Sequence, residues 1–299
     1  MQIKTEAELE EFLSRPSDAD VAAMAQLDGD LLILGVGGKM GPSLARRARR
    51  AIQNAKVRKR IVVVARFSDD SLRDKLESDG METLVSDLLE PGALAKLPDI
   101  PNVIFMAARK FGTTGSEDLT WAMNTLLPAL VAERYRKSRI VAFSTGNVYP
   151  LIDVTRGGAD ESTLAAPQGE YAQSALGRER MFEYGSRQSG TPVVILRLNY
   201  AIDLRYGVLG DIGTAVFERR PIDLRMGFVN VIWQGDANSV CLRSFAHCQS
   251  PPMVLNLTGP ETLPVRHIAE EFGRRFGVRP RRVLLPCGRS RCRRSPPLR

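Results

Sequence analysis

The sequence of 299 residues predicts an α/β fold in which helices cover both faces of a doubly wound parallel sheet. Short apolar runs that read as buried strands alternate with stretches that read as helices, which is typical of parallel strands joined by right-handed crossovers. A glycine-rich turn follows the first apolar run and precedes a helix. From about residue 200 the alternation loosens, which indicates a smaller C-terminal α+β lobe.

The first predicted strand and its turn lie in residues 30–41, DLLILGVGGKMG. Gly35, Gly38 and Gly41 follow one another at three-residue intervals, and Pro42 opens the next helix, where proline is tolerated. Glycines let the backbone approach a pyrophosphate, and the first N–H groups of a helix point at it. The pattern predicts a dinucleotide site of the Rossmann-like type. A turn that only joins a strand to a helix is the alternative.

The remaining elements continue this alternation. A capping box at residues 5–8 opens a short helix, so the N-terminal segment reads as a helical appendage. Runs rich in Val, Ile and Leu predict further strands, at residues 60–65, 81–87, 102–108, 139–144 and 192–197, and helices are predicted at about 43–55, 117–135 and 171–188. The predicted domains are the appendage 1–28, an NAD(P)-binding Rossmann domain 29–200, a substrate lobe 201–278 and a basic tail 279–299.

The net charge of +8 comes from the end of the chain. Residues 279–299 contain eight arginines and no acidic residue, and the rest of the chain has 34 basic and 34 acidic residues. A neutral body has no overall attraction for a phosphate backbone, so we expect no nucleic-acid partner. The tail reads either as a disordered basic arm or as an end that is not native to the folded domain.

Composition also bears on the cellular location of the protein and on whether it binds a metal. We find no apolar run that approaches the roughly 18 residues of a membrane span, and the N-terminus lacks the apolar core of a signal peptide, so a cytoplasmic location is expected. The spacing of Cys241, His247 and Cys248 matches no zinc signature. Cys287 and Cys292 lie in the basic tail. We expect reduced thiols and no metal site.

Four further motifs follow the glycine turn. They are FSTGNVYP at residues 143–150, EYAQSALGRE at 170–179, RLNY at 197–200 and VIWQGDA at 231–237. In this order the motifs resemble the extended short-chain dehydrogenase/reductases, the group of sugar-nucleotide epimerases and dehydratases. The resemblance covers roughly residues 30 to 275 and not the tail. It implies a Rossmann-like fold, a nicotinamide cofactor, a small-molecule substrate such as a nucleotide sugar, and a homodimer.

The resemblance also implies catalytic roles. In that family a Ser or Thr hydroxyl orients a substrate oxygen, and a Tyr moves a proton while hydride passes to or from the nicotinamide. Thr145 and Tyr171 match these positions. The family's Lys, four residues after the Tyr, lowers the pKa of the phenol and holds the nicotinamide ribose. Here that position is Ala175.

The alanine leaves two interpretations open. In one, another cation replaces the missing lysine: Arg178 lies two helical turns beyond Tyr171, and Arg109 and Lys110 follow the fourth predicted strand. Of these, Lys110 is the preferred candidate, because an amine fits close to a phenol in a cramped site. In the other, the chain binds a nucleotide without catalysis, as a regulator or a partner subunit.

The type of reaction depends on the residues after Thr145. Dehydratases of this group place Asp-Glu there, which donates a proton to the leaving hydroxyl, whereas this chain has Gly146 and Asn147. Elimination of water is therefore not expected. Epimerisation, or oxidation and reduction at a carbonyl or alcohol, needs only the Tyr and the cofactor and is favoured.

Cofactor choice depends on the end of the second strand. Arg66 lies where an adenosine 2′-phosphate would sit, and Lys39 is nearby in the glycine loop, so NADP is favoured over NAD. Two aspartates that follow Arg66 could instead serve a ribose. Asp87 resembles the family's adenine contact, with a helix cap as the alternative. The predicted cofactor contacts also include Met40 and Ala107.

Overall fold

The computed structural model of the protein describes residues 2–110 and 112–283. The chain forms two compact units. The larger unit contains the described residues up to Ala201, together with Val231–Gly259. The smaller unit contains Ile202–Asn230 and the described residues from Pro260 onward.

A seven-stranded parallel sheet forms the centre of the larger unit, in the order β11-β6-β5-β4-β1-β2-β3. Its strands are β1 Leu31–Leu34, β2 Ile61–Ala65, β3 Glu82–Val85, β4 Asn102–Phe105, β5 Arg139–Thr145, β6 Val193–Leu198 and β11 Met253–Leu257. From β1 the chain adds β2 and β3 on one side and then β4, β5 and β6 on the other. The order therefore reverses between β1 and β4, the place where such sheets bind ligands. The predicted parallel α/β fold is confirmed.

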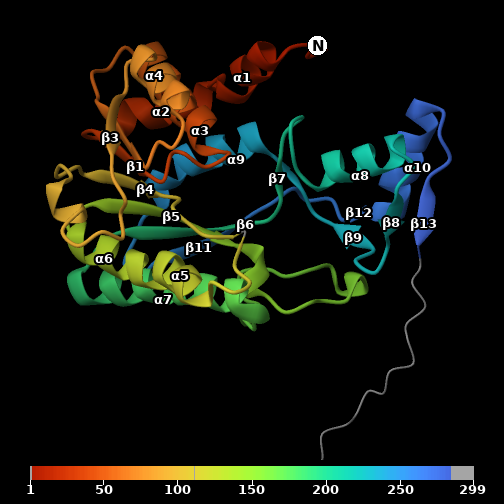
Figure 1. Ribbon diagram of the computed structural model, residues 1–299. Coiled ribbons are helices and arrows are strands. Elements are labelled where there is room, and N and C mark those ends of the chain that lie inside the picture. Colours follow the sequence, from red (N-terminus) through yellow and green to blue (C-terminus); the bar gives the residue numbers. More distant parts are fainter. Residues whose placement is uncertain (1, 111, 284–299) are drawn as a thin grey trace, which may run out of the picture. The chain divides into compact units, whose positions relative to one another are not determined.

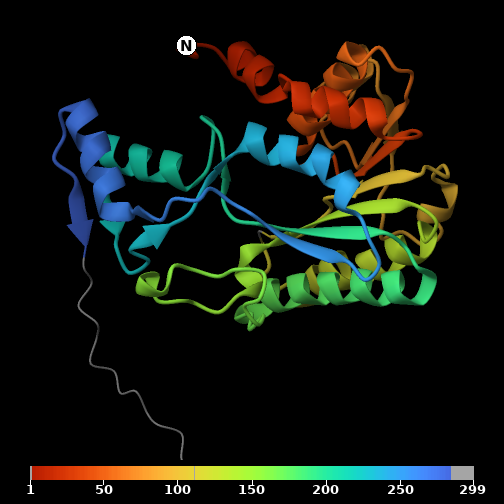
Figure 2. The ribbon, with the colours of Figure 1, turned by 180° about the vertical axis from the view of Figure 1, so that it is seen from behind.

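Helices cover both faces of this sheet (Figure 1). One face carries α2, α3, α4 and α9, and the other carries α6 and α7, with the sheet between them (Figure 2). Strand side chains alternate accordingly: Leu31 and Ile33 pack in one apolar cluster, and Leu32 and Leu34 in the other. The helices of this unit are α1 Glu6–Ser14, α2 Asp18–Gln26, α3 Gly41–Asn54, α4 Asp70–Ser78, α5 Glu117–Trp121, α6 Leu127–Arg134, α7 Gly169–Ser189 and α9 Gln234–Arg243.

Two segments differ from the domain boundaries expected from the sequence. Residues 1–28 were expected to form an appendage, yet α1 and α2 both contact α3 and α9 within the larger unit. Residues 231–259 were expected in the smaller lobe, but they return to the larger unit. The reason is that α9 buries Ala237 and Cys241 in the core and β11 pairs with β6.

The helix expected at about 117–135 forms as three pieces. A π-helical segment, Ala122–Leu126, separates α5 from α6, and the N–H of Leu127 bonds to the carbonyl of Ala122. Pro128, in the first turn of α6, has no N–H to offer to the carbonyl of Asn124, four residues earlier. A mid-helix widening of this kind is often found at functional sites.

The smaller unit has its own small core. Its helices and strands are α8 Val208–Phe217, α10 Val265–Phe276, β8 Pro221–Asp223, β9 Phe228–Val229, β12 Leu263–Pro264 and β13 Arg281–Val283. Phe217 of α8 meets Phe276 of α10 edge to face, with ring centres 5.7 Å apart. Along the chain, the division into units falls within the short strand β7 Ala201–Ile202 and just before β10 Ile232–Trp233.

The predicted basic tail begins with ordered structure. It was expected from residue 279, but β13 pairs in parallel with β8 and so belongs to the smaller unit. The rest of the predicted tail, with Cys287 and Cys292, lies outside the described residues. None of the helices in residues 2–110 and 112–283 has the length and apolar character needed to span a membrane.

A buried ion pair joins the N-terminal helices to the larger unit. The carboxylate of Asp20 caps its own helix and accepts a hydrogen bond from the backbone N–H of Ser17 at 2.8 Å. It also pairs with Arg47 of α3 at 2.6 Å and accepts a bond from the hydroxyl of Ser239 in α9 at 2.6 Å. Burial acts against its charge, but the bonds from Ser239, Ser17 and Arg47 outweigh burial and lower the pKa of Asp20.

We expect Asp20→Asn to reduce the free energy of unfolding by about 3 kcal/mol at neutral pH, because it leaves Arg47 buried without its partner. The folded-state pKa of Asp20 lies below its unfolded value of about 3.9, so the contribution is present above that value and is lost as the pH falls through the folded-state pKa. Urea unfolding at several pH values tests this, with exposed Asp18→Asn as the control. Equal losses for the two variants would contradict the prediction.

Candidate functional site

Backbone contacts close the glycine turn between β1 and α3. Gly35 has φ +91°, and a Cβ at this residue would lie 2.6 Å from the backbone nitrogen of Ala107, which follows β4. A Cβ at Gly41 would lie 2.1 Å from the carbonyl oxygen of Val36. Neither position accepts a side chain without moving backbone. The turn therefore lies directly against the end of β4, where the order of the strands reverses.

The middle of the turn has more room. A Cβ at Gly38 would meet only the carbonyl oxygen of Gly35, at the ordinary distance of 3.8 Å. Lys39 is exposed, and the half-buried Met40 packs against the core just before α3 begins. An open backbone followed by the first turn of a 14-residue helix fits a diphosphate, whose negative charge the helix N-terminus favours.

Side chains of helix α9 form hydrogen bonds with this first turn of α3. The side-chain amides of Gln234 and Asn238 donate to the hydroxyl of Ser43 at 2.8 and 3.0 Å, and all three residues are buried. The Ser43 hydroxyl in turn donates to the carbonyl of Met40 at 3.1 Å. These supports were missed in the sequence, although the motif at residues 231–237 marked the start of α9.

Two lysines lie close together at the turn. The charge of Lys39 acts on Lys110, and partial burial acts more strongly, so both lower the pKa of Lys110. The ammonium of Lys110 also lies 5.6 Å from the ring centre of Tyr200, a residue with φ +39°. Two neighbouring ammonium groups favour an anion beside them. This electrostatic interaction between Lys39 and Lys110 was not predicted from the sequence.

The structure places the other two predicted cofactor residues at strand ends. Arg66 is exposed and directly follows β2. Asp87 follows β3, and its carboxylate accepts a bond from the backbone N–H of Leu89 at 3.0 Å. Asp87 thus closes a turn and is not the N-cap of a helix, the alternative expected for it, and its contact with adenine stays a prediction.

Asn147 links the neighbourhood of Thr145 to the cavity that Tyr171 lines. Thr145 ends β5 and is buried, and its hydroxyl oxygen accepts a bond from the backbone N–H of Asn147 at 3.2 Å. Asn147 and Tyr171 line the same cavity, of about 380 Å³, and the short helix Gly146–Val148 contacts α7. The carboxyl-bearing residues Glu117 and Glu170 line this cavity as well. The hydroxyl and the phenol that the motifs predicted therefore belong to one region.

A buried asparagine from the π-helical segment connects this region to the loop after β4. The side chain of Asn124 bonds to both backbone groups of Arg109, accepting from the N–H and donating to the carbonyl, each at 2.9 Å. It also donates to the hydroxyl of Ser174 at 3.0 Å and accepts from Arg178 at 2.8 Å. Sequence reasoning missed Asn124, and Pro128 was the available signal for a distorted helix at this point.

A second buried network lies under the end of β5. Glu179 of α7 accepts bonds from Arg197 of β6, at 2.7 Å for the closest pair, and from the hydroxyl of Ser144 at 2.5 Å. Burial acts against the charge of Arg197, but its bonds to Glu179 and Tyr149 prevail and raise the pKa of Arg197. Ser144, the residue before Thr145, is therefore bonded to Glu179 of α7, and Arg197 of β6 holds this glutamate in place.

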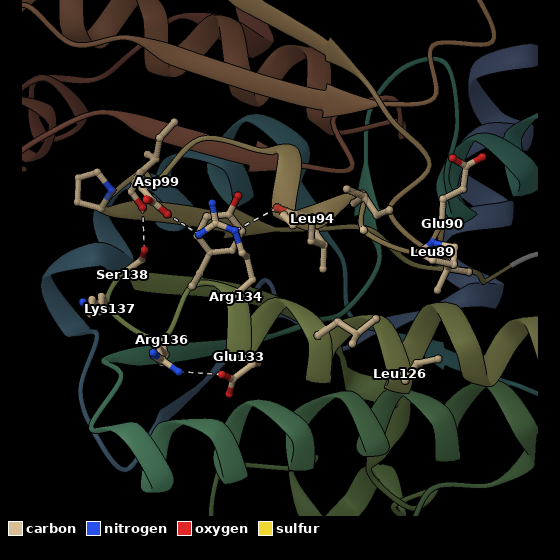
Figure 3. A pocket seen from close by; sticks show the side chains of 18 residues that line it. Leu89, Glu90, Leu94, Asp99, Leu126, Glu133, Arg134, Arg136, Lys137 and Ser138 are labelled. Atoms are coloured by element: carbon tan, nitrogen blue, oxygen red, sulfur yellow. Dashed lines mark hydrogen bonds and ion pairs between the residues drawn. The ribbon is translucent and has the colours of Figure 1, made fainter.

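A second cavity, with a greater volume, lies elsewhere in the larger unit. It has a volume of about 1020 Å³ and is lined by residues of the 88–101 loop and of 126–138 (Figure 3). Four of its charged side chains form two pairs: Arg134 bonds to Asp99 at 2.5 Å and Arg136 to Glu133 at 2.9 Å (Figure 3). Because it contains neither the glycine turn nor Tyr171, we place the functional site at the smaller cavity and the turn.

Comparison with known proteins agrees with this fold. The structure resembles MoeE5 in complex with UDP-glucose and NAD, with a TM-score of 0.69, 18% identity, and coverage of 85% of this chain and 84% of that one. It also resembles UDP-glucuronic acid 4-epimerase from Bacillus cereus in complex with NAD, with a TM-score of 0.70, 16% identity and 85% coverage of each chain. UDP-glucose 4-epimerase from Thermotoga maritima gives 0.70, 14% and 85% of each. No curated protein matches the sequence significantly.

The sequence itself carries the family assignment. Residues 31–201 match the model of the NAD dependent epimerase/dehydratase family, over more than half of the chain. This range includes the glycine turn, Thr145 and Tyr171, and so four of the five motifs on which the resemblance rested. The chain therefore belongs to the NAD dependent epimerase/dehydratase family.

Proposed function

We propose that this protein is an NAD(P)-dependent enzyme that acts on a nucleotide sugar, by epimerisation or by oxidation and reduction of a hydroxyl-bearing carbon. One observation supports the proposal: Asn147, which bonds to the Thr145 hydroxyl, lines one cavity with Tyr171, in the unit that also holds the glycine turn. The solved structures that it resembles hold NAD with UDP-glucose or act as UDP-sugar 4-epimerases. A homodimer stays a prediction.

The residues of this chain supply binding and proton transfer. The turn around Gly38 and the start of α3 would hold the cofactor diphosphate, with Lys39 and Lys110 beside it. When bound, the nicotinamide exchanges hydride with a carbon of the substrate. The Thr145 hydroxyl oxygen accepts a bond from the backbone N–H of Asn147, which leaves its own proton available for a substrate oxygen. The phenolic oxygen of Tyr171 takes up or returns the proton of the substrate hydroxyl. The catalytic role of Lys110 stays a prediction.

Incubation of the purified protein with NAD or NADP and a panel of UDP-hexoses and UDP-uronic acids tests this proposal. Chromatography of the sugars reports epimers, and cofactor absorbance reports net oxidation or reduction. We expect product from at least one sugar. Cofactor binding without turnover of any sugar would contradict the proposal and would favour a regulator that only binds the nucleotide.

For the cofactor, we propose a preference for NADP. Arg66 extends from the end of β2, next in the sheet to the strand that carries the turn, and Lys39 adds a second charge. We expect Arg66→Asp to weaken NADP binding about tenfold or more and to shift the preference towards NAD, because it replaces attraction for the 2′-phosphate with repulsion. Fluorescence titration of both cofactors at one salt concentration measures this. Unchanged ratios of the two affinities would remove the argument, and the exposed Arg180→Asp on α7 controls for net charge.

A further inference from the structure

Ala175 and Arg178 form a complementary pair on one face of α7. Ala175, at the position of the family's Lys, is completely buried and offers no charge. Arg178 lies three residues further along the same face, and its side chain is also buried, with 3% of the residue exposed. Long side chains on a helix lean towards its N-terminus, so Arg178 and Ala175 share the part of the helix surface that leads back towards Tyr171.

The contacts of Arg178 fix its charge in place. Its Nη1 donates to the carbonyl of Phe143 at 2.8 Å, and Phe143 lies two residues before Thr145 on β5. Its Nη2 donates to Asn124 at 2.8 Å, and its guanidinium carbon lies 5.9 Å from the ring centre of Phe105. Both acceptors are neutral oxygens, and within the described residues its Nε has no hydrogen-bond partner.

The buried charge of Arg178 interacts with two other residues of the same helix, Tyr171 and Glu179. Burial lowers the pKa of Arg178, while the charges of Tyr171 and Glu179 act in the opposite sense, and an arginine remains protonated at neutral pH. Glu179 is already bonded to Arg197 and Ser144. A positive charge away from water is weakly screened, and the interaction of Arg178 with the charge of an ionised Tyr171 is mutual.

The same residue also holds the turn that carries Tyr171. Arg178 bonds to Asn124, which donates to the hydroxyl of Ser174, and this hydroxyl donates to the backbone carbonyl of Tyr171 at 2.9 Å. One connected set of hydrogen-bonded groups therefore both supports the backbone at Tyr171 and includes the positive charge of Arg178.

We propose that Arg178 is a positioning residue that replaces the missing lysine by supplying the buried positive charge that stabilises the ionised form of Tyr171. The inference rests on the proposed function for its catalytic meaning, but the ionisation of Tyr171 can be measured without a substrate. Other charged groups face the same region. Glu117 and Glu170 line the cavity with Tyr171, and Glu170 also accepts a bond from the indole N–H of Trp121 at 2.5 Å. Carboxylates near a phenol act against its ionisation, and a buried cation acts in favour of it.

Arg178→Gln and Arg178→Lys separate charge from packing, because the first keeps a hydrogen-bond donor without the charge and the second keeps the charge. Ultraviolet difference titration, with each protein compared with its own Tyr171→Phe version, reports ionisation of Tyr171 alone. We expect Arg178→Gln to move the midpoint upward by about one pH unit or more, a tenfold change in the ionisation equilibrium, and Arg178→Lys to move it much less. Adding Ala175→Lys to Arg178→Gln is expected to restore the midpoint.

Two results would overturn the proposal: the same midpoint in Arg178→Gln as in the unchanged protein, or equal upward shifts in the Gln and Lys variants. Arg47→Gln, which removes another buried arginine in α3, controls for loss of stability and is expected to leave the midpoint unchanged. If Arg178→Gln does not fold, the titration midpoints of two other proteins decide the outcome. These are Arg178→Lys and the double variant that combines Arg178→Met with Ala175→Lys. A shift in ionisation without turnover of any nucleotide sugar would support the role of Arg178 and contradict only the proposed function.

Discussion

Replacing Tyr171 with Phe is expected to lower kcat for the nucleotide sugar by about 10²- to 10⁴-fold, the contribution of a positioned acid or base. The substitution removes one oxygen and keeps the ring, which lines the cavity beside Asn147. Cofactor affinity and thermal stability should stay close to those of the unchanged protein, because the phenolic oxygen is assigned to proton transfer. Steady-state kinetics with the sugar found by the panel, and fluorescence titration of the cofactor, measure the two effects separately.

Tyr184→Phe is the matched control, because Tyr184 lies on the same helix and is 64% exposed. We expect it to change kcat little. A kcat for Tyr171→Phe within a few-fold of that of Tyr184→Phe would show that another group moves the proton.

A methyl group at Gly38 is expected to weaken cofactor binding by about 100-fold while leaving the protein folded. The nearest protein atom to a Cβ at this position is 3.8 Å away, so Ala is accepted by the protein itself. A bound diphosphate would approach the same backbone, and the added methyl would push it off the helix N-terminus. Titration of NAD and NADP, with thermal unfolding of the same samples, measures both parts of the prediction.

Two other glycines make this test specific. Gly210→Ala in α8 adds a methyl where no other atom lies within 4 Å. It should therefore not lower the stability of the protein, and it should leave cofactor affinity unchanged. Gly41→Ala places a Cβ 2.1 Å from the carbonyl oxygen of Val36 and should reduce both stability and affinity. Full cofactor affinity in Gly38→Ala would mean that the turn only joins β1 to α3.

The elements that local sequence determines were predictable. The apolar run of β1 is buried on both faces, and its alternating side chains enter two different apolar clusters, so composition alone marked it as a central strand. Gly35 and Gly41 were recognisable because their spacing reflects backbone contacts that admit no side chain. Thr145 and Tyr171 were found through their motifs.

Contacts between distant segments could not be predicted in the same way. β11 completes the sheet beside β6 after the chain has passed through the smaller unit, so its sequence neighbours gave no sign of its partner. The bonds from Asn124 to Arg109 and Arg178 span 15 and 54 positions. Arg178 was one of several cations near a predicted site, and only its burial beside Ala175 distinguishes it from an exposed charge.

The central claim is that Tyr171 and a cofactor held at the glycine turn act together on a nucleotide sugar. Rapid mixing of the protein, loaded with oxidised cofactor, with each UDP-sugar of the panel tests it directly through the absorbance of the reduced nicotinamide. For the sugar that is the substrate, we predict that the unchanged protein reduces its bound cofactor. In Tyr171→Phe we predict that this reduction is slower by a factor of about 10² or more. Tight binding of both cofactor and sugar without any reduction, or equal reduction in the two proteins, would contradict the account.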